Sequence, residues 1–322
     1  MGCMDPVIVV GGGISGVACA RALTEGGVDV RLLDRGRRLG GRMAVRTVDG
    51  HPVDTGASYF TVSDDRFAAV VGEWKARGLA REWTDTFEVY DDGERGEPKE
   101  GSMRWASPRG LRCLVEDLAE GVPTEQSDVQ AVTRDEHTGT LAVDGRPADT
   151  VVLAMPDPQA HRLLDPSITS RSQLSGEYAP TLALLAGWER RSWHEGFDGA
   201  FVNGDASLTW VADDGARRGD GAPVLVAHAT EELAQQHLAD PEGAEPAMLE
   251  ALTDLLGIRD RPTWSRVQRW LFAHPTETHE DAFHLGDDGV GFCGDSWSEK
   301  PRVEAAWLSG TLLGQAIVER RG

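Results

Sequence analysis

Residues 7–16 read VIVVGGGISG, and this stretch decides the fold of the chain. Its β-branched run is typical of a buried strand, and the glycines end that strand where a helical segment begins. The helix closes at Gly26-Gly27, because glycine readily forms a left-handed cap, and a second apolar strand runs from Val28 to Asp34. Residues 7–34 therefore predict the βαβ unit of Rossmann-type folds.

Each glycine of this turn has a physical task. Gly11 permits the tight turn, Gly13 lets the backbone approach a pyrophosphate without a Cβ in the way, and Gly16 lets helix and strand pack closely. The anion then lies at the positive end of the helix, and Asp34 is placed to accept hydrogen bonds from the adenosine ribose. An ordinary glycine turn is the alternative. Strand, helix and acid together favour a dinucleotide-binding site.

The composition is typical of a soluble globular protein. Hydrophobic residues make up 40% of the 322-residue chain, and no apolar run reaches the roughly 18 residues that a membrane-spanning helix needs. The start of the sequence has neither the basic segment nor the cleavage site of a signal peptide. We therefore expect a cytoplasmic protein with no membrane partner, built from two lobes that share one ligand.

The net charge and the cysteines argue against two other kinds of site. A formal charge of −21 argues against a broad nucleic-acid-binding face, which needs a positive surface to displace counterions. Cys3, Cys19, Cys113 and Cys293 are scattered, without a CxxC pair or metal-ligand spacing. We expect reduced thiols, no metal site and no nucleic-acid partner.

Hydrophobic patterns predict the remaining elements. Short alternating segments around residues 129–143 lead to the apolar run 150–154, which predicts a β-meander returning to a buried parallel strand. Residues 246–256 predict a helix with leucines at helical spacing, and a final helix is expected from Val303. Strands are predicted within residues 181–188, 208–212 and 224–228, and exposed hairpins or loops without chemistry at 86–103 and 213–221.

Two further segments bear on the choice between NAD and FAD. Residues 37–42 read RRLGGR, and a glycine pair with an arginine lets a loop close over a pyrophosphate and supply a charge-assisted donor. A solvated basic loop is the alternative. Residues 291–297 read GFCGDSW and precede RVEAAWLSG at 302–310. Together these patterns resemble the GG-doublet flavoproteins, the broad group of amine oxidases, phytoene desaturases and protoporphyrinogen oxidases.

The resemblance implies that the cofactor is FAD. In these flavoproteins the Gly-Asp pair binds the pyrophosphate and ribityl chain, and the next helix aims its N-terminus at the flavin pyrimidine carbonyls, which favours the anionic reduced flavin. None of the cysteines lies in a recognisable flavin-attachment sequence, so we expect FAD to bind non-covalently. The residues expected to bind it are Gly11, Gly13, Ile14, Ser15, Gly16, Asp34, Arg35, Gly41, Arg42, Ala57, Ser58, Tyr59, Phe60, Val129, Gly294, Asp295, Arg302, Val303, Glu304 and Ala305.

Within that group the chain is most similar to the renalases, particularly the bacterial renalase-like proteins. Residues 54–61, DTGASYFT, resemble the renalase run that lies against the flavin, with Ser58 in place of the usual Gln. Further similar stretches are 103–110, 156–159 and 269–275. The resemblance covers almost the whole chain, strongly at the ends and loosely through 165–265.

The implied fold is α/β: a Rossmann-type three-layer FAD-binding domain with an inserted substrate domain that contains an antiparallel sheet. The FAD-binding domain is expected to comprise residues 1–62, 105–158 and 288–322, and the substrate domain 63–104 and 159–287. Ligands of such folds lie at the carboxyl ends of the parallel strands. We expect Tyr59, Phe60, Trp270 and Trp297 to position the substrate, although tryptophans also commonly fill cores.

The implied activity is oxidation of 2- or 6-dihydro isomers of NAD(P) by hydride transfer to flavin N5. Oxygen then takes the electrons as hydrogen peroxide, and NAD(P)⁺ is released. A dedicated general base is not required, since hydride loss restores an aromatic pyridinium. Two alternatives stay open: a flavin amine oxidase, and a non-catalytic FAD-binding redox sensor.

Overall fold

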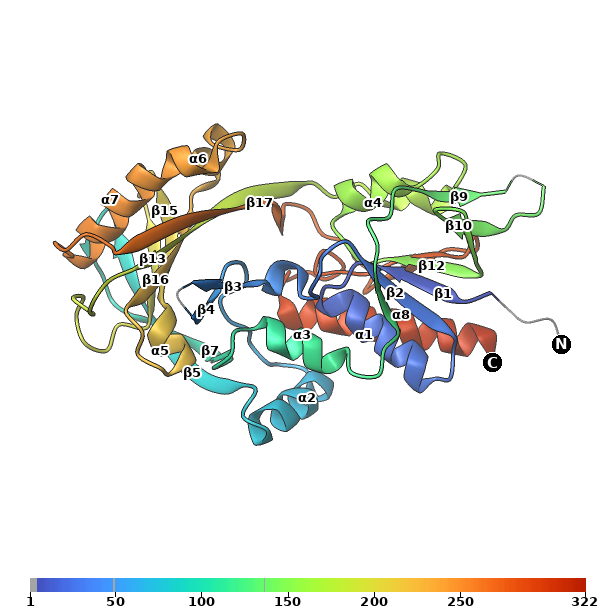
Figure 1. The fold of residues 1–322 in the computed structure, drawn as a ribbon, viewed down its shortest axis with the longest axis horizontal. Helices are drawn as coiled ribbons and strands as arrows, with labels where there is room; N and C mark the ends of the chain where they lie inside the picture. The colour runs from blue at the N-terminus through green and yellow to red at the C-terminus, as the bar shows by residue number, and fades with distance from the viewer. Residues whose placement is uncertain (1–4, 49, 136) are drawn as a thin grey trace. The chain divides into compact units, whose positions relative to one another are not determined.

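The computed structural model describes residues 5–48, 50–135 and 137–322 (Figure 1), so Cys3 lies outside the described residues. The chain forms two compact units. The first unit comprises the residues up to Gly41 together with Val115–Tyr178 and His274–Gly322. The second unit comprises Arg42–Leu114 and Ala179–Ala273.

These units differ from the expected domain boundaries. Residues 42–62 and 105–114, expected in the FAD-binding domain, belong to the second unit, whereas 159–178 and 274–287 belong to the first. The division into compact units shows which segments pack together, but it does not show which of them bind a cofactor. The assignment of residue ranges to an FAD-binding and a substrate domain therefore stays a prediction.

The first unit is built on a largely parallel sheet. Its strands are β1 (Val7–Val10), β2 (Val30–Asp34), β8 (Thr124–Gln126), β12 (Thr150–Leu153), β18 (His284–Leu285) and β19 (Val290–Phe292), in the order β18-β19-β12-β1-β2-β8. Val7 pairs in parallel with Val30 on one side and Thr150 on the other, and only β18 runs antiparallel to its neighbour. The βαβ unit and the parallel strand near residue 150 are thus confirmed.

The two faces of this sheet are covered differently. Ile8, Val10 and Leu153 pack with the predicted meander, which forms a separate three-stranded sheet of β9 (Val132–Arg134), β10 (Leu141–Val143) and β11 (Arg146–Ala148). Because side chains alternate along a strand, Val9 points to the opposite face, where α1 (Ile14–Glu25) and α8 (Val303–Arg321) lie side by side (Figure 1). The result is the expected three-layer α/β architecture.

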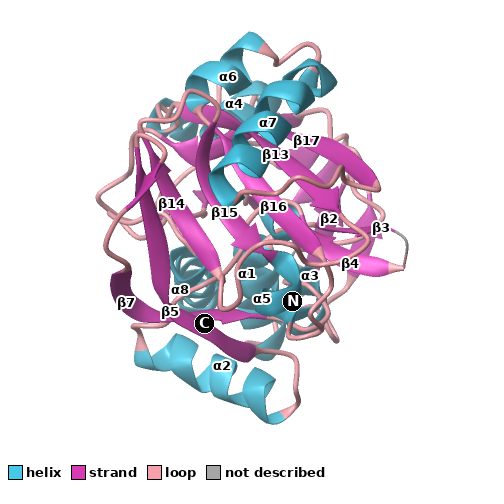
Figure 2. Cartoon of the chain, turned by 90° about the vertical axis from the view of Figure 1, so that its left-hand side faces the viewer, coloured by secondary structure: helices cyan, strands magenta, loops and turns pink. Residues whose placement is uncertain are grey.

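The second unit is built on a larger mixed sheet. In the described residues its eight strands are β5 (Arg81–Asp91), β6 (Glu94–Arg95), β7 (Lys99–Ala106), β13 (Tyr178–Gly187), β14 (Gly199–Asn203), β15 (Leu208–Asp213), β16 (Val224–Ala229) and β17 (Trp264–Pro275). The strands β13, β16, β15 and β14 are antiparallel neighbours, whereas β14 and β5 pair in parallel. Figure 2 shows α6 (Glu231–Gln236) and α7 (Glu245–Leu256) over β13, β15 and β16.

Smaller elements complete the described chain. They are the hairpin β3 (Val45–Val48) and β4 (His51–Asp54), the helices α2 (Asp65–Ala76), α3 (Arg112–Leu118), α4 (Asp157–Leu163) and α5 (Asp214–Arg218), and the 3₁₀ turns Gly41–Met43, Thr169–Gln173 and Pro241–Ala244. No helix among the described residues combines the length and apolar character needed to cross a bilayer.

The prediction for residues 213–221 is wrong. The segment was expected to be exposed, yet α5 buries Asp214, Arg217 and Arg218, which pair with one another. Charges of both signs three and four residues apart in one short helix neutralise each other, so the polar composition does not indicate exposure. Residues 86–103 form the expected hairpin, but Phe87 and Tyr90 in it are buried.

Candidate functional site

The glycine turn of the first unit has the geometry that its sequence predicts. Gly11 has φ +113°, a backbone conformation that favours glycine. A Cβ on Gly16 would clash with the Gly11 carbonyl oxygen, so this glycine is required for packing of helix on strand. A Cβ on Gly13 would meet no other atom within 4 Å. Gly13 therefore borders open space, whereas Gly11 and Gly16 are confined by the protein itself.

The carboxylate of Asp34 at the end of β2 stabilises this turn. Its Oδ2 accepts a hydrogen bond from the Gly12 backbone N–H at 2.6 Å, and its Oδ1 accepts one from Gly36 at 2.6 Å. Each carboxylate oxygen keeps a lone pair that can accept a further hydrogen bond. Half-buried Asp34 is thus rigidly held and able to receive a ribose hydroxyl.

The glycine-pair loop lies against the same turn. The Gly40 N–H donates to the Gly12 carbonyl at 2.8 Å, and a Cβ on Gly41, which has φ +53°, would lie 3.1 Å from the Gly13 Cα. Arg35 is exposed. Arg42 belongs to the second unit, where its Nη1 donates to the Ala273 carbonyl at 3.1 Å. The structure therefore brings the glycines of the two motifs together within one unit.

The C-terminal motif contributes the start of α8. The Gly294 N–H donates to the Ser309 hydroxyl at 3.1 Å, which ties the Gly-Asp turn to the helix that follows it. Arg302 occupies the N-cap position and forms a 2.7 Å ion pair with Glu304, whose side chain is fully buried in the first helical turn next to Val303 and Ala305. Asp295 is half-buried, and Val129 lies in the core beside the meander.

The residues at the start of α1 fit an anionic group. The first turn of α1 carries no acidic residue and no side-chain cap, so the positive helix end is not neutralised locally. The Ser15 hydroxyl is buried and has no hydrogen-bond partner among the residues that the structure describes. A buried hydroxyl normally has a partner. An orphaned hydroxyl, open space at Gly13 and an uncapped helix together match a dinucleotide pyrophosphate.

Trp297 lies in the core of the first unit. Its ring stacks on His279 with centroids 3.8 Å apart, and His279 in turn contacts the buried Asp157 carboxylate at 2.8 Å. The backbone N–H of His279 donates to the Ser296 carbonyl at 2.8 Å. These contacts fix the turn that follows Gly294. The substrate role expected of Trp297 stays a prediction.

In the second unit, residues 54–60 are held by contacts from several sides. The Thr55 N–H donates to the Ala44 carbonyl at 3.1 Å and the Ala57 N–H to the Arg42 carbonyl at 2.8 Å. The indole N–H of Trp270 donates to the Thr55 carbonyl at 2.6 Å. Trp270 thus anchors this segment, a role that its sequence context did not indicate.

A buried ion-pair cluster holds the same segment from α5. Arg217 contacts the Asp54 carboxylate at 3.3 Å and Asp214 more closely, and it donates to the Ser58 carbonyl at 2.7 Å. Burial raises the pKa of Asp54 and lowers the pKa of Arg217, and the attraction between the two charges opposes both shifts. Sequence reasoning missed Arg217; its only signal was the Asp213-Asp214 pair ahead of Arg217-Arg218.

Tyr59 and Phe60 lie in different aromatic clusters. Tyr59 is half-buried beside Phe87, whose ring centroid is 5.5 Å away, and beside Trp83 and Trp210, both at 6.3 Å. Phe60 is only 2% exposed and packs among Phe67, Trp74 and Trp105. Phe60 is therefore enclosed by aromatic side chains, whereas Tyr59 is partly accessible. Ala57 and Ser58 link Tyr59 and Phe60 to Asp54 and Thr55, the anchored start of the segment at residues 54–60.

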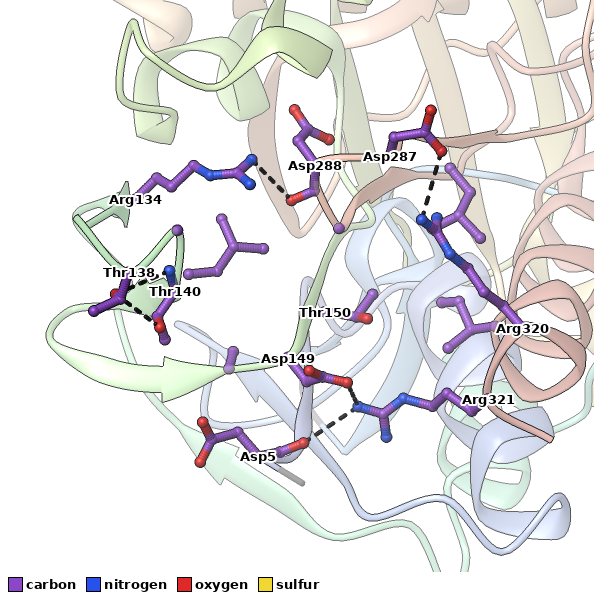
Figure 3. Close-up of a pocket in the computed structure, with 16 residues that line it drawn as sticks. Asp5, Arg134, Thr138, Thr140, Asp149, Thr150, Asp287, Asp288, Arg320 and Arg321 are labelled. Atoms are coloured by element: carbon purple, nitrogen blue, oxygen red, sulfur yellow. Dashed lines mark hydrogen bonds and ion pairs between the residues drawn. The ribbon is translucent and has the colours of Figure 1, made fainter. Parts of the chain in front are cut away.

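A surface pocket of about 580 Å³ lies elsewhere in the first unit (Figure 3). None of the site residues expected from the sequence lines it. Its arginines already have partners: Arg321 pairs with Asp149, Arg320 with Asp287 at 3.5 Å, and Arg134 donates to the Asp288 carbonyl at 3.4 Å. Each of these arginines therefore has a partner within the protein, although the Arg321 Nε is buried without one.

Comparison with known families identifies the chain. A model of NAD(P)-binding Rossmann-like domains matches residues 9–74, and a model of flavin containing amine oxidoreductases matches residues 76–318. The second match covers well over half of the chain. The chain belongs to the flavin-containing amine oxidoreductase family. FAD is the cofactor that this membership implies, and flavin-dependent oxidoreduction is the chemistry that it implies.

Curated relatives of this family member match shorter stretches. A carotenoid 3,4-desaturase of Haloarcula japonica is 42% identical over 71 residues, 21% of this chain and 14% of the relative. Polyamine oxidase 4 of Oryza sativa is 39% identical over 93 residues, 28% of this chain and 19% of the relative. A coproporphyrinogen III oxidase of Mycobacterium leprae is 28% identical over 192 residues, 55% of this chain and 38% of the relative. The chain thus spans well under half the length of these relatives.

Solved structures of similar fold cover this family member almost completely. A protein from Exiguobacterium sp. 255-15, provisionally named a protoporphyrinogen oxidase, has a TM-score of 0.79 at 17% identity, covering 99% of this chain and 100% of that one. Cyclohexylamine oxidase from Brevibacterium oxydans IH-35A has a TM-score of 0.77 at 15% identity, covering 99% and 100%. At these identities the likeness establishes the fold.

Proposed function

We propose that this flavin-dependent oxidoreductase is a renalase-type oxidase. Its substrates are 2- or 6-dihydro isomers of NAD(P), and its products are NAD(P)⁺ and, with oxygen, hydrogen peroxide. The observation that carries the proposal is the segment at residues 54–60. It resembles the renalase run against the flavin, is fixed by Trp270 and Arg217, and places Tyr59 at the accessible edge of an aromatic cluster suited to a flat ring.

The first unit would hold FAD without a covalent bond. We assign the pyrophosphate to the open space at Gly13 and the orphaned Ser15 hydroxyl, and the ribose to Asp34. Gly41, the Gly294-Asp295 turn and the start of α8 are further members of the predicted set. When bound, FAD would supply the acceptor for the hydride, which carries the two electrons that leave the substrate.

The remaining work of the protein is positioning. Hydride loss turns a dihydronicotinamide into an aromatic cation without removal of a proton, so no side chain is required as a general base. Tyr59 and Trp270 are our candidates in the second unit for orienting the substrate ring, and Trp297 stays the candidate in the first unit. Phe60 is enclosed by other aromatic rings, and we assign it to packing.

A flavin amine oxidase is the second candidate. Membership of the amine oxidoreductase family and the polyamine oxidases among the relatives favour it. Such an enzyme must present a neutral amine to the flavin and releases an imine that hydrolyses to a carbonyl compound. The two candidates therefore differ in their products.

Aerobic turnover separates the candidates. Purified holoenzyme is mixed with 2-dihydro, 6-dihydro and ordinary 4-dihydro NAD(P)H and with a panel of primary amines and polyamines. We expect one NAD(P)⁺ and one hydrogen peroxide per 2- or 6-dihydro isomer consumed, and much slower turnover of the 4-dihydro form. Carbonyl product and peroxide from an amine, with no isomer consumed, would replace the proposal by the amine oxidase.

A further inference from the structure

The sheet of the second unit has two chemically different faces. On one face Leu184, Val211 and Ala227 pack against Met248 and Leu252 of α7, forming an apolar core. The other face carries larger aromatic groups. Phe201, Trp210 and His228 are paired across three neighbouring strands, and they point away from the helices because Val211, the next residue after Trp210, points toward them.

Arg104 lies on this second face without a counter-charge. Its side chain is only 6% exposed, and its guanidinium lies 4.0 Å from the Phe87 ring centroid and 5.8 Å from that of Tyr59. Its Nη1 is buried without a hydrogen-bond partner, and no carboxylate of residues 5–48, 50–135 or 137–322 pairs with it. Stacking on an aromatic ring recovers only part of the cost of burying a charge.

A second orphaned donor lies beside the same rings. Trp210 is 7% exposed, and its ring centroid is 6.3 Å from Tyr59 and 6.1 Å from Phe87. Its indole N–H is buried and has no acceptor in the described part of the chain. A buried indole N–H usually has a partner. Two unsatisfied donors, one of them charged, thus flank Tyr59 and Phe87.

We infer that Arg104 and Trp210 form a subsite for a phosphate group of the substrate. A guanidinium and an N–H can both donate to anionic oxygens, and a phosphate supplies several such acceptors at once. This inference rests on the proposed function, whose substrate is a phosphate-bearing dinucleotide. It also predicts a charge preference, because an unpaired buried guanidinium near Tyr59 disfavours a protonated amine and favours an anion.

Binding of phosphate-bearing and phosphate-free probes to the holoenzyme tests the subsite. Oxidised nicotinamide mononucleotide carries one phosphate and nicotinamide riboside carries none, so calorimetric titration of both isolates the phosphate contribution without turnover. We expect the mononucleotide to bind at least about 10-fold more tightly. Arg104→Met should weaken it by about 10- to 100-fold, the size of a charge-assisted hydrogen bond, and change riboside affinity less than about twofold.

Three further variants keep the test falsifiable. Arg104→Lys retains the charge and should restore part of the mononucleotide affinity, and Trp210→Phe should remove one donor while keeping a ring. Arg95→Met is the matched control, because Arg95 lies on the same hairpin, is exposed, and pairs with Glu88 at 2.6 Å. It should leave both affinities unchanged. Thermal unfolding of each holoenzyme establishes that the variants are folded.

The outcomes separate the subsite from the proposed function. Equal wild-type affinities for the two probes, or folded Arg104→Met and Trp210→Phe variants with wild-type mononucleotide affinity, would overturn the subsite even if dihydronicotinamides are oxidised. Equal weakening of both probes by Arg104→Met would also overturn it, since that result indicates a packing role. Phosphate binding that depends on Arg104, with no isomer oxidised, would support the subsite and refute the proposed activity.

Discussion

Gly13 and Gly16 lie in the same turn, yet substitutions at the two positions should fail for different reasons. A Cβ at Gly13 meets no protein atom, whereas one at Gly16 clashes with the Gly11 carbonyl. Gly13→Val should therefore leave a folded protein that has lost FAD, because the side chain fills the space of the pyrophosphate. Gly16→Val, the matched control, should lose the fold itself. Flavin absorbance per protein and thermal unfolding distinguish the two; wild-type FAD content in Gly13→Val would contradict the assignment.

Loss of the Asp34 carboxylate should weaken FAD binding without changing the rate at which bound FAD is reduced. Asp34→Ala removes the acceptor proposed for the ribose and also the hydrogen bonds from Gly12 and Gly36. We expect a loss of roughly 1.5–3 kcal/mol in FAD binding, as for a hydrogen bond to a charged group. Titration of the apoprotein with FAD measures this loss, and rapid mixing of the FAD-saturated variant checks the rate. A large fall in reduction rate with affinity intact would refute the ribose role.

At the residue scale, local motifs were predictable and distant partners were not. Gly11, Gly13, Gly16 and Asp34 lie within one βαβ unit, so their geometry follows from spacing along the chain. Arg104 and Trp210 meet the rings of Phe87 and Tyr59 only through strand pairing between segments far apart in sequence. No spacing rule encodes such a meeting. An isolated arginine in a sequence gives no indication that it is buried unpaired.

At the scale of elements, α5 connects stability to the proposed site. Arg217→Met leaves Asp54 buried without its ion-pair partner and Asp214 with Arg218 alone, which should cost about 3–5 kcal/mol of unfolding free energy. Arg66→Met, the control, removes an exposed ion pair with Asp64 and should cost less than about 1 kcal/mol. Urea unfolding of both variants measures the difference. Similar small losses in the two would show that the cluster does not hold residues 54–60.

Helices and strands with a clear hydrophobic pattern were predicted correctly from the sequence. The helix α7 and the parallel strand β12 were predictable because their apolar residues repeat at helical spacing or form a continuous buried run. The short helix α5 was not, because its buried residues are charged and neutralise one another. Polarity indicates exposure only where no opposite charge is available for pairing.

For the whole molecule, we expect non-covalent FAD. The cysteines within the described residues, Cys19, Cys113 and Cys293, are buried, and none lies in a recognisable attachment sequence. The purified protein should be yellow, and acid precipitation should release intact FAD into the supernatant. Chromatography of the supernatant against authentic FAD is the check. Flavin that stays in the washed pellet would show a covalent link.

The overall architecture was predictable from sequence, whereas the bounds of the two compact units have no local signal. The α/β class follows from the βαβ unit, the meander and the returning strand, all of which have local signals. Residues 42–62 carry motifs that suggested the cofactor domain, yet they pack with the large mixed sheet. A sequence motif indicates what a segment binds, whereas its packing determines to which core the segment belongs. The two need not coincide.

The central claim is that dihydronicotinamide isomers, and not amines, reduce this flavin. The 2-, 4- and 6-dihydro forms yield the same cation on losing hydride, so selectivity must come from geometry, and a misplacement of about 1 Å can cost on the order of 100-fold in rate. Anaerobic stopped-flow mixing of the holoenzyme with each isomer and with primary amines follows flavin bleaching directly. We expect rapid bleaching by a 2- or 6-dihydro isomer and slow bleaching by the 4-dihydro form. Rapid bleaching by an amine with none by any isomer, or bleaching by no compound tested, would contradict the claim.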